Sequence, residues 1–140
     1  MSAEQNKAIV ERINEEIWNK GNLDLIPQFI SPEYVYHSPI VGDMKGHEGY
    51  KQYVTSNRAL FSDYHGTITG IVAEGNMVAM RLAYTGTHDG SIMGIPPTGK
   101  KINMEIASFM RFENGKQVEE WAYVDTLTFF KQLGIPIPQE

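Results

Sequence analysis

The sequence predicts a single α+β domain built around one antiparallel sheet. Helical patterns occupy the chain up to about residue 60, four runs rich in β-branched and aromatic residues follow, and one short helical segment lies near the end. Helices and strands do not alternate, which argues against a parallel sheet with crossover helices. A length of 140 residues is typical of one domain with its own core, so we expect one domain over residues 1–140.

The first predicted element is an amphipathic helix from about Ala3 to Lys20. Its apolar side chains recur at every fourth position: Ile9, Ile13 and Ile17. Ser2 and Gln5 fit a capping box at its start, and Gly21 can adopt the left-handed conformation that ends many helices. This helix should therefore cover the core with one apolar face.

Two short elements and a second long helix complete the first half of the chain. The segment from Leu23 to Ile30 favours one or two helical turns, and Tyr34 to Ser38 is typical of a short strand. A helix is predicted from about Gly46 to Leu60. Three of its side chains are expected to point inward: Tyr50, Tyr53 and Val54.

The second half of the chain predicts the sheet. Four strands are expected at Tyr64–Glu74, Met77–Thr87, Lys101–Glu113 and Gln117–Val124. The turn segments at residues 74–76 and 113–116 are short enough to close antiparallel hairpins, and the Gly/Pro-rich residues 89–99 form a longer connector. A final helix over Thr126–Leu133 should end at Gly134, ahead of a proline-containing tail.

Both faces of the predicted sheet carry apolar side chains, because successive residues of a strand alternate between its faces. One face of the strand at residues 101–113 holds Met104, Ile106, Met110 and Phe112. The opposite face holds Glu105, Ala107, Phe109 and Arg111. The helices of this chain can cover only one face, so we expect a homodimer in which a second copy covers the other.

Composition argues against several classes of function. The formal net charge of −5 disfavours nucleic-acid binding, and the absence of cysteine removes thiolate catalysis, cysteine zinc sites and disulfides. The first residues lack a secretion signal pattern, and no apolar run approaches the roughly 20 residues that a membrane span needs. We therefore expect a cytoplasmic protein that binds neither nucleic acid nor membranes.

The segment Gly94–Lys100 has the glycines and lysine of a phosphate-binding loop but lacks the rest of its chemistry. Lys101 stands where Ser or Thr would bind magnesium, and Pro96 and Pro97 have no N–H group to donate to phosphate. A strand is predicted next, so no helix dipole would face the anion. The four histidines also lack the close spacing of metal ligands, and no metal or cofactor is expected.

Asp125 is the strongest candidate for catalysis on local sequence. By alternation it shares a strand face with Glu119, Trp121 and Tyr123. Aromatic neighbours desolvate a carboxylate and raise its pKa toward the range that proton transfer near neutral pH requires. The alternative is structural, because Asp is a favoured N-cap and Asp125 directly precedes the helix that begins at Thr126.

Four other polar residues are candidates for a pocket wall. His37 and His88 lie at strand ends, where a histidine can donate a hydrogen bond, carry a proton or simply bond to the backbone. Arg81 and Glu105 are charged positions in otherwise apolar strands. They are expected either to pair with each other or, for Arg81, to orient a carbonyl or carboxylate in a cavity.

The chain resembles the SnoaL-like polyketide cyclase (ester cyclase) family of the NTF2-like fold. The resemblance rests on residues 34–39 (Tyr-Val-Tyr-His-Ser-Pro), residues 86–90 (Gly-Thr-His-Asp-Gly), residues 94–100 (Gly-Ile-Pro-Pro-Thr-Gly-Lys) and Glu120-Trp121 with Asp125 beyond them. The closing Gln132-Leu133-Gly134 is also similar, so nearly the whole chain is covered. The resemblance implies a cone, in which a curved, mixed or antiparallel sheet wraps around a pocket plugged by N-terminal helices, and a dimer.

The resemblance also implies cofactor-free intramolecular aldol condensation of a polyketide ester, with Asp125 as acid or base. The polar or aromatic lining would then include His37, Arg81, His88 and Trp121. Our hypothesis is enolisation of a hydrophobic, carbonyl-containing molecule: Asp125 moves the proton, and His88, His37 or Arg81 stabilises the oxygen that becomes negative. Tyr123 and Glu105 complete the predicted substrate site.

Two alternatives stay open at this point. One is another enzyme on the same cone, either an isomerase or an epoxide hydrolase that holds a water between Asp125, Glu105 and Arg81. The other is a non-catalytic module that binds a hydrophobic metabolite. Asp125 lining the cavity favours catalysis, whereas Asp125 serving only as a helix cap favours binding.

Overall fold

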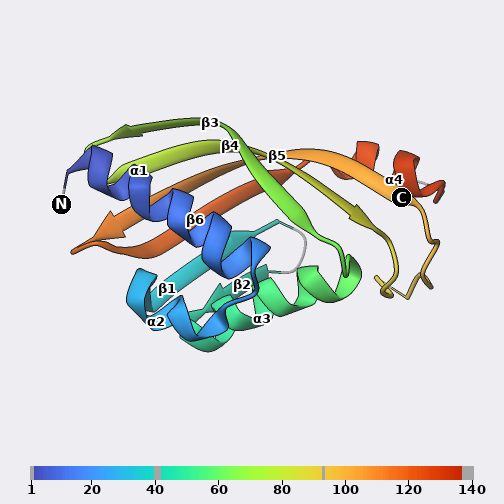
Figure 1. Ribbon diagram of the computed structural model, residues 1–140, viewed down its shortest axis with the longest axis horizontal. Helices are drawn as coiled ribbons and strands as arrows, with labels where there is room; N and C mark the ends of the chain where they lie inside the picture. The colour runs from blue at the N-terminus through green and yellow to red at the C-terminus, as the bar shows by residue number, and fades with distance from the viewer. Residues whose placement is uncertain (1, 40–41, 93, 137–140) are drawn as a thin grey trace.

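The computed structural model describes residues 2–39, 42–92 and 94–136, so the predicted domain limits at residues 1 and 140, and the tail beyond Pro136, lie outside the described residues. The helices are α1 (Ala3–Arg12), α2 (Ile26–Phe29), α3 (Gly46–Leu60) and α4 (Thr126–Leu133). The strands are β1 (Ile30–Ser38), β2 (Gly42–Lys45), β3 (His65–Glu74), β4 (Met77–Thr87), β5 (Lys101–Glu113) and β6 (Lys116–Val124). Figure 1 shows a long curved sheet with α1, α2 and α3 on one side and α4 at one end.

The N-terminal helix has its predicted extent but changes geometry halfway. The capping box predicted at residues 2 and 5 makes both of its hydrogen bonds, at 2.8 and 3.1 Å. Beyond α1 the helix continues as a π-helical segment at Ile13–Asn19, a rare geometry that is frequent at functional sites. Asn14 and Asn19 donate to the carbonyl oxygen of Gly66 in β3, at 3.2 and 2.9 Å. These bonds fix the segment against the sheet.

The six strands form one mixed sheet in the order β2-β1-β6-β5-β4-β3. Four neighbouring pairs are antiparallel, and the two predicted hairpins are present. The turn between β5 and β6 has Asn114 and Gly115 at φ of 51° and 76°, the positive values that a type I′ turn requires. The pair β1–β6 departs from the antiparallel expectation because it is parallel. The short β2, which pairs with β1, was not predicted.

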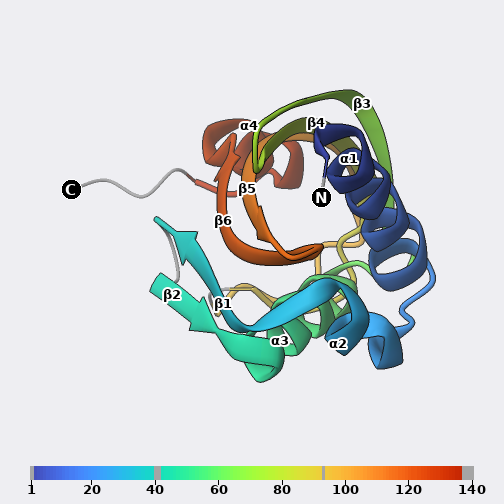
Figure 2. The ribbon, with the colours of Figure 1, turned by 90° about the vertical axis from the view of Figure 1, so that its left-hand side faces the viewer.

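The sheet curls so that α1 and α3 lie against its concave side (Figure 2). The apolar set predicted for one face of β5 is on this side, where Met104 and Met110 are buried together with Val78 and Leu82 of β4. The convex side exposes Phe109 and Tyr123, which are 46% and 55% accessible. The prediction that both faces carry apolar residues is therefore confirmed. No helix within the described ranges is long and apolar enough to cross a membrane.

Candidate functional site

A large cavity lies between the concave face of the sheet, the N-terminal helix, α3 and α4. Its volume is about 990 Å³, at the upper end for small-molecule pockets. Nine aromatic side chains line it: Trp18, Tyr36, Tyr50, Tyr53, Phe61, Tyr64, Tyr84, Phe129 and Phe130. Such a wall suits a flat apolar molecule with a few polar atoms.

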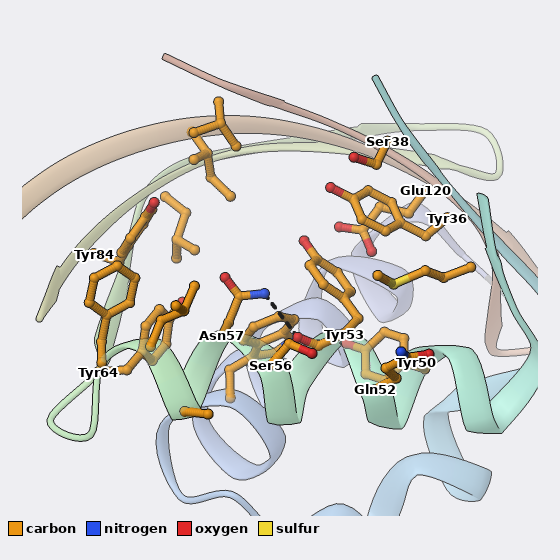
Figure 3. Close-up of a pocket in the computed structure, with 18 of the residues that line it drawn as sticks. Tyr36, Ser38, Tyr50, Gln52, Tyr53, Ser56, Asn57, Tyr64, Tyr84 and Glu120 are labelled. Atoms are coloured by element: carbon orange, nitrogen blue, oxygen red, sulfur yellow. Dashed lines mark hydrogen bonds between the residues drawn. The ribbon is translucent and has the colours of Figure 1, made fainter. Parts of the chain in front are cut away.

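Helix α3 supplies one side of the cavity (Figure 3). Tyr50, Tyr53 and Asn57 are spaced three and four residues apart and so share one helix face, which confirms the predicted inward direction of the two tyrosines. Tyr50 accepts a hydrogen bond from Nε1 of Trp18 at 2.9 Å. Tyr53 stacks on Tyr36 with ring centroids 4.3 Å apart. Contacts of Tyr50 and Tyr53 with aromatic residues from other elements of the cavity wall therefore hold α3 in place.

The cavity opens where α3 approaches the loop before β5 and the end of β6. The exposed residues on its wall are Gln52, Ser56, Ala59, Ser91 and Val124. Gly90 lies so close to α3 that a Cβ atom there would stand 2.2 Å from the carbonyl oxygen of Ala59. A larger residue at position 90 would therefore push the loop away from α3 and widen the opening.

Glu120 is the only Asp, Glu, His, Lys or Arg on the described wall of the cavity. Its side chain comes from β6 and is buried, with 6% of the residue accessible. Oε1 accepts hydrogen bonds from the Tyr34 hydroxyl at 2.8 Å and from Nε2 of Gln117 at 3.0 Å. Oε2 accepts one from the Ser108 hydroxyl at 2.8 Å. Burial raises the pKa of the Glu120 carboxyl, and these three hydrogen bonds partly oppose that rise.

The tyrosines that line the cavity carry neutral hydroxyl groups near pH 7. Burial raises the pKa of Tyr50 and Tyr53 well above the usual range, and it raises the pKa of Tyr84 to about 12. Figure 3 shows Tyr36, Tyr53 and Glu120 at one end of the cavity and Tyr84 at the other. The site thus combines one buried carboxyl group with several phenol hydroxyls inside an apolar enclosure.

Asp125 does not line the cavity, contrary to the expectation from sequence. It is the exposed N-cap of α4, where Oδ1 accepts from the Thr128 backbone N–H at 3.1 Å and Oδ2 from the Thr128 hydroxyl at 2.6 Å. These bonds lower the pKa of Asp125, the opposite of the predicted direction. The physical reason is that no aromatic ring desolvates the carboxylate and the helix N-terminus stabilises its charge.

His37, Trp121 and Tyr123 lie on the convex face, outside the cavity. His37 binds Glu119 through Nε2 at 2.7 Å and Asp43 through Nδ1 at 3.2 Å, and its ring stacks on Trp121 with centroids 5.4 Å apart. The bond to Glu119 is the main cause that raises the pKa of His37. Tyr123 is 55% accessible. Alternation along β6 placed Trp121 and Tyr123 on one face correctly, but the cavity is on the other face.

Arg81 and Glu105 are also exposed on the convex face. The register sets Arg81 opposite Ala107, and its Nε donates to the Thr69 hydroxyl at 3.0 Å in place of the expected pair with Glu105. Because both charges lie outside the cavity, they do not form the water site that an epoxide hydrolase would need with Asp125.

His88 is fully buried and connects the loop before β5 to β4. Its Nδ1 is 2.9 Å from the Thr98 hydroxyl and accepts from the Thr98 backbone N–H at 3.3 Å. His88 is not among the residues that line the cavity. Lys101 begins β5 directly after this loop, so the strand predicted in place of a phosphate-binding helix is confirmed.

Sequence reasoning missed Glu120, although a signal was present. Alternation along β6 sets position 120 on the same face as Val118, Ala122 and Val124, so a charged residue stands there among apolar ones. A lone carboxylate on an apolar strand face is rarely left without a partner or a function. The polar and aromatic side chains at alternate positions of the opposite face instead led to a predicted site on that face: Glu119, Trp121, Tyr123 and Asp125.

Comparisons with known proteins agree with this architecture. A family model described as SnoaL-like polyketide cyclase matches residues 8–133. The aklanonic acid methyl ester cyclase DauD of Streptomyces sp. (strain C5) is 31% identical over 129 residues, covering 88% of this chain and 78% of that protein. The nogalonic acid methyl ester cyclase of Streptomyces nogalater is 29% identical over 125 residues, covering 88% and 93%.

Solved structures show the same fold. The crystal structure of IdmH from Streptomyces antibioticus superposes with a TM-score of 0.80 at 30% identity, covering 94% of this chain and 99% of that one. A SnoaL-like protein from Jannaschia sp. CCS1 superposes with a TM-score of 0.87 at 20% identity, covering 96% and 95%. The predicted α+β cone is thereby confirmed. The chain belongs to the SnoaL-like polyketide cyclase family.

Proposed function

We propose that this protein is an ester cyclase that closes a ring in a polyketide ester by intramolecular aldol addition, without metal or cofactor. The observation that carries the proposal is the aromatic cavity of about 990 Å³, whose described wall holds one carboxyl group, that of Glu120. Asp125 is only a helix cap and by itself would favour a binding module, so the case for catalysis depends on Glu120 in its place. Two relatives that cover most of the chain are named as cyclases of aklanonic acid methyl ester and nogalonic acid methyl ester, which supports an ester as the substrate.

The chemistry requires little beyond positioning and one proton carrier. Removal of a proton from carbon between two carbonyl groups gives an enolate, whose carbon attacks a ketone carbon of the same molecule. The cavity would hold the polyketide chain of the substrate folded against the wall formed by Tyr36, Tyr53 and Trp18, so the reacting carbons of one molecule meet. The phenol hydroxyls would donate to the oxygen that becomes negative.

The experiment is an assay of purified protein with aklanonic acid methyl ester and nogalonic acid methyl ester, with a chelator present. Ring closure by an aldol step conserves mass, so we expect a new chromatographic peak of unchanged mass that forms faster than in buffer. The variant Ile106→Trp places a larger ring on the cavity wall and should lower turnover, whereas Lys101→Trp adds the same ring at an exposed position of β5 and should not. Saturable binding without turnover of either ester, or of other aromatic polyketide esters, would instead identify a binding module.

We also propose that a second copy of the chain covers the convex face. Phe109 of β5 lies directly opposite Trp121 of β6, and Tyr123 follows on the same face. Phe109 and Tyr123 are half exposed, which is costly for large aromatic side chains gathered on one surface. A homodimer formed through these residues would leave the mouth of the cavity on the other side free. The cytoplasmic location expected from the sequence stays a prediction.

A further inference from the structure

Glu120 differs from every other charged residue of the described chain in its position. The sequence contains 12 Lys+Arg, 17 Asp+Glu and 4 His, and among those described only Glu120 faces the cavity. A buried carboxylate costs several kcal/mol of desolvation unless hydrogen bonds compensate for it. Three strands provide that compensation, through Tyr34 of β1, Ser108 of β5 and Gln117 of β6.

The three donors leave the carboxylate able to react. A carboxylate has about four lone-pair positions, of which three are used here. Figure 3 shows the carboxyl group of Glu120 beside the rings of Tyr36 and Tyr53, and both phenols interact electrostatically with it. A substrate lying against these two rings would therefore meet both a base and hydroxyl donors.

We propose that Glu120 is the proton carrier of this site, an inference that rests on the proposed cyclisation. The ionised carboxylate takes the proton from carbon between two carbonyl groups as the C–H bond breaks. The enolate carbon then forms a C–C bond to the ketone carbon, and the π electrons of that C=O move to its oxygen. Glu120 returns the proton to this alkoxide, so the step consumes no co-reactant and regenerates the carboxylate.

Tyr34, Ser108 and Gln117 are positioning residues in this scheme. They hold the plane of the carboxyl group from three different strands, so rotation away from the cavity would break their hydrogen bonds. They also favour the ionised form against the effect of burial. Removal of one donor should therefore shift the pH dependence of the reaction, which a purely structural hydrogen bond would not do.

Proton removal can be tested without ring closure. Methyl 3-(2-naphthyl)-3-oxopropanoate is a flat β-keto ester with an acidic methylene group and no second ketone placed to close a ring. We expect wild-type protein in D₂O to exchange these protons faster than buffer does. Glu120→Gln should lower the protein-catalysed exchange by roughly 10²–10⁴-fold while binding of the ester persists, and Glu120→Asp should retain part of the rate.

Matched controls separate catalysis from folding. Glu119→Gln changes the neighbouring carboxylate on the opposite face, and it should exchange within about twofold of wild type because no cavity contact is altered. Ser108→Ala removes one donor to Oε2 and should move the midpoint of the pH profile upward. This second variant keeps the inference testable if Glu120→Gln does not fold.

The outcomes distinguish the inference from the proposed function. Exchange by wild type that is lost in Glu120→Gln, without cyclisation of any ester, would retain Glu120 as the proton carrier and overturn the cyclase. Cyclisation that continues at full rate in Glu120→Gln would overturn the inference and leave the cyclase standing. A pH profile unchanged by Ser108→Ala, or the absence of exchange in wild type, would also overturn it.

Discussion

Glu119 and Glu120 are consecutive residues of β6 whose carboxylates serve opposite sides of the sheet. Glu119 binds His37 at 2.7 Å and Arg111 at 3.1 Å on the convex surface. Glu120 is enclosed on the concave side by donors from three strands. Because successive side chains of a strand point to opposite faces, Glu119 forms partly exposed ion pairs whereas Glu120 is a buried acid. The pKa of Glu119 is accordingly lowered and the pKa of Glu120 is raised.

Substitution of Asp125 should affect stability and leave the chemistry intact. Asp125→Asn keeps an N-cap oxygen, so both turnover and thermal midpoint should stay close to wild type. Asp125→Ala loses the cap and should lower the free energy of unfolding. Urea unfolding and the cyclisation assay measure the two effects. A hundredfold loss of turnover in the folded Asn variant would restore Asp125 as the acid or base.

Tyr34→Phe should destabilise the fold through Glu120. The substitution removes the hydroxyl that donates to Oε1 and leaves a buried carboxylate with one hydrogen bond fewer. Loss of a hydrogen bond to a charged buried group costs about 1.5–3 kcal/mol. Urea unfolding at pH 7 measures the change against the wild-type protein. A stability equal to that of wild type would contradict a charged Glu120.

His37 should make stability depend on pH. Its hydrogen bond to Glu119 raises the pKa of His37 above 6.5, so its contribution is fully present below about pH 6.5 and is lost as pH rises through the raised value. We expect His37→Gln to lower the urea midpoint more at pH 6 than at pH 9. The effect should be small, because the side chain is 34% accessible and solvent screens the pair. An equal difference at both pH values would argue against this assignment.

Light scattering should give about twice the chain mass of 15.8 kDa for the wild-type protein. Tyr123→Glu places a charge in the proposed interface and should shift the mass to that of one chain. Glu11→Lys changes an exposed residue of α1, on the other side of the sheet, and should leave the dimer intact. A wild-type monomer at micromolar concentration would contradict the proposed dimer.

Local sequence patterns predicted most of the helices and strands. The helix at Thr126–Leu133, the strands at residues 77–87 and 101–113 and the capping box at Ser2 were predictable, because each depends on neighbouring residues only. The site was harder to predict from the sequence, because both faces of β5 and β6 are partly apolar. The curvature of the sheet decides which of the two faces encloses a cavity. The packing of α1 and α3 determines which face is concave, and the sequence of a single strand does not contain that information.

The parallel pairing of β1 with β6 has a consequence for how the protein is made. Tyr34 and Glu120 are 86 residues apart in the sequence, so they meet only after β6 has left the ribosome and taken its place between β1 and β5 in the sheet. A nascent chain that has emerged as far as β5 exposes the unpaired edges of β1 and β5, and such edges invite association with other chains. The contact that places the carboxyl group is thus among those of longest sequence separation, and it should form late and slowly during folding.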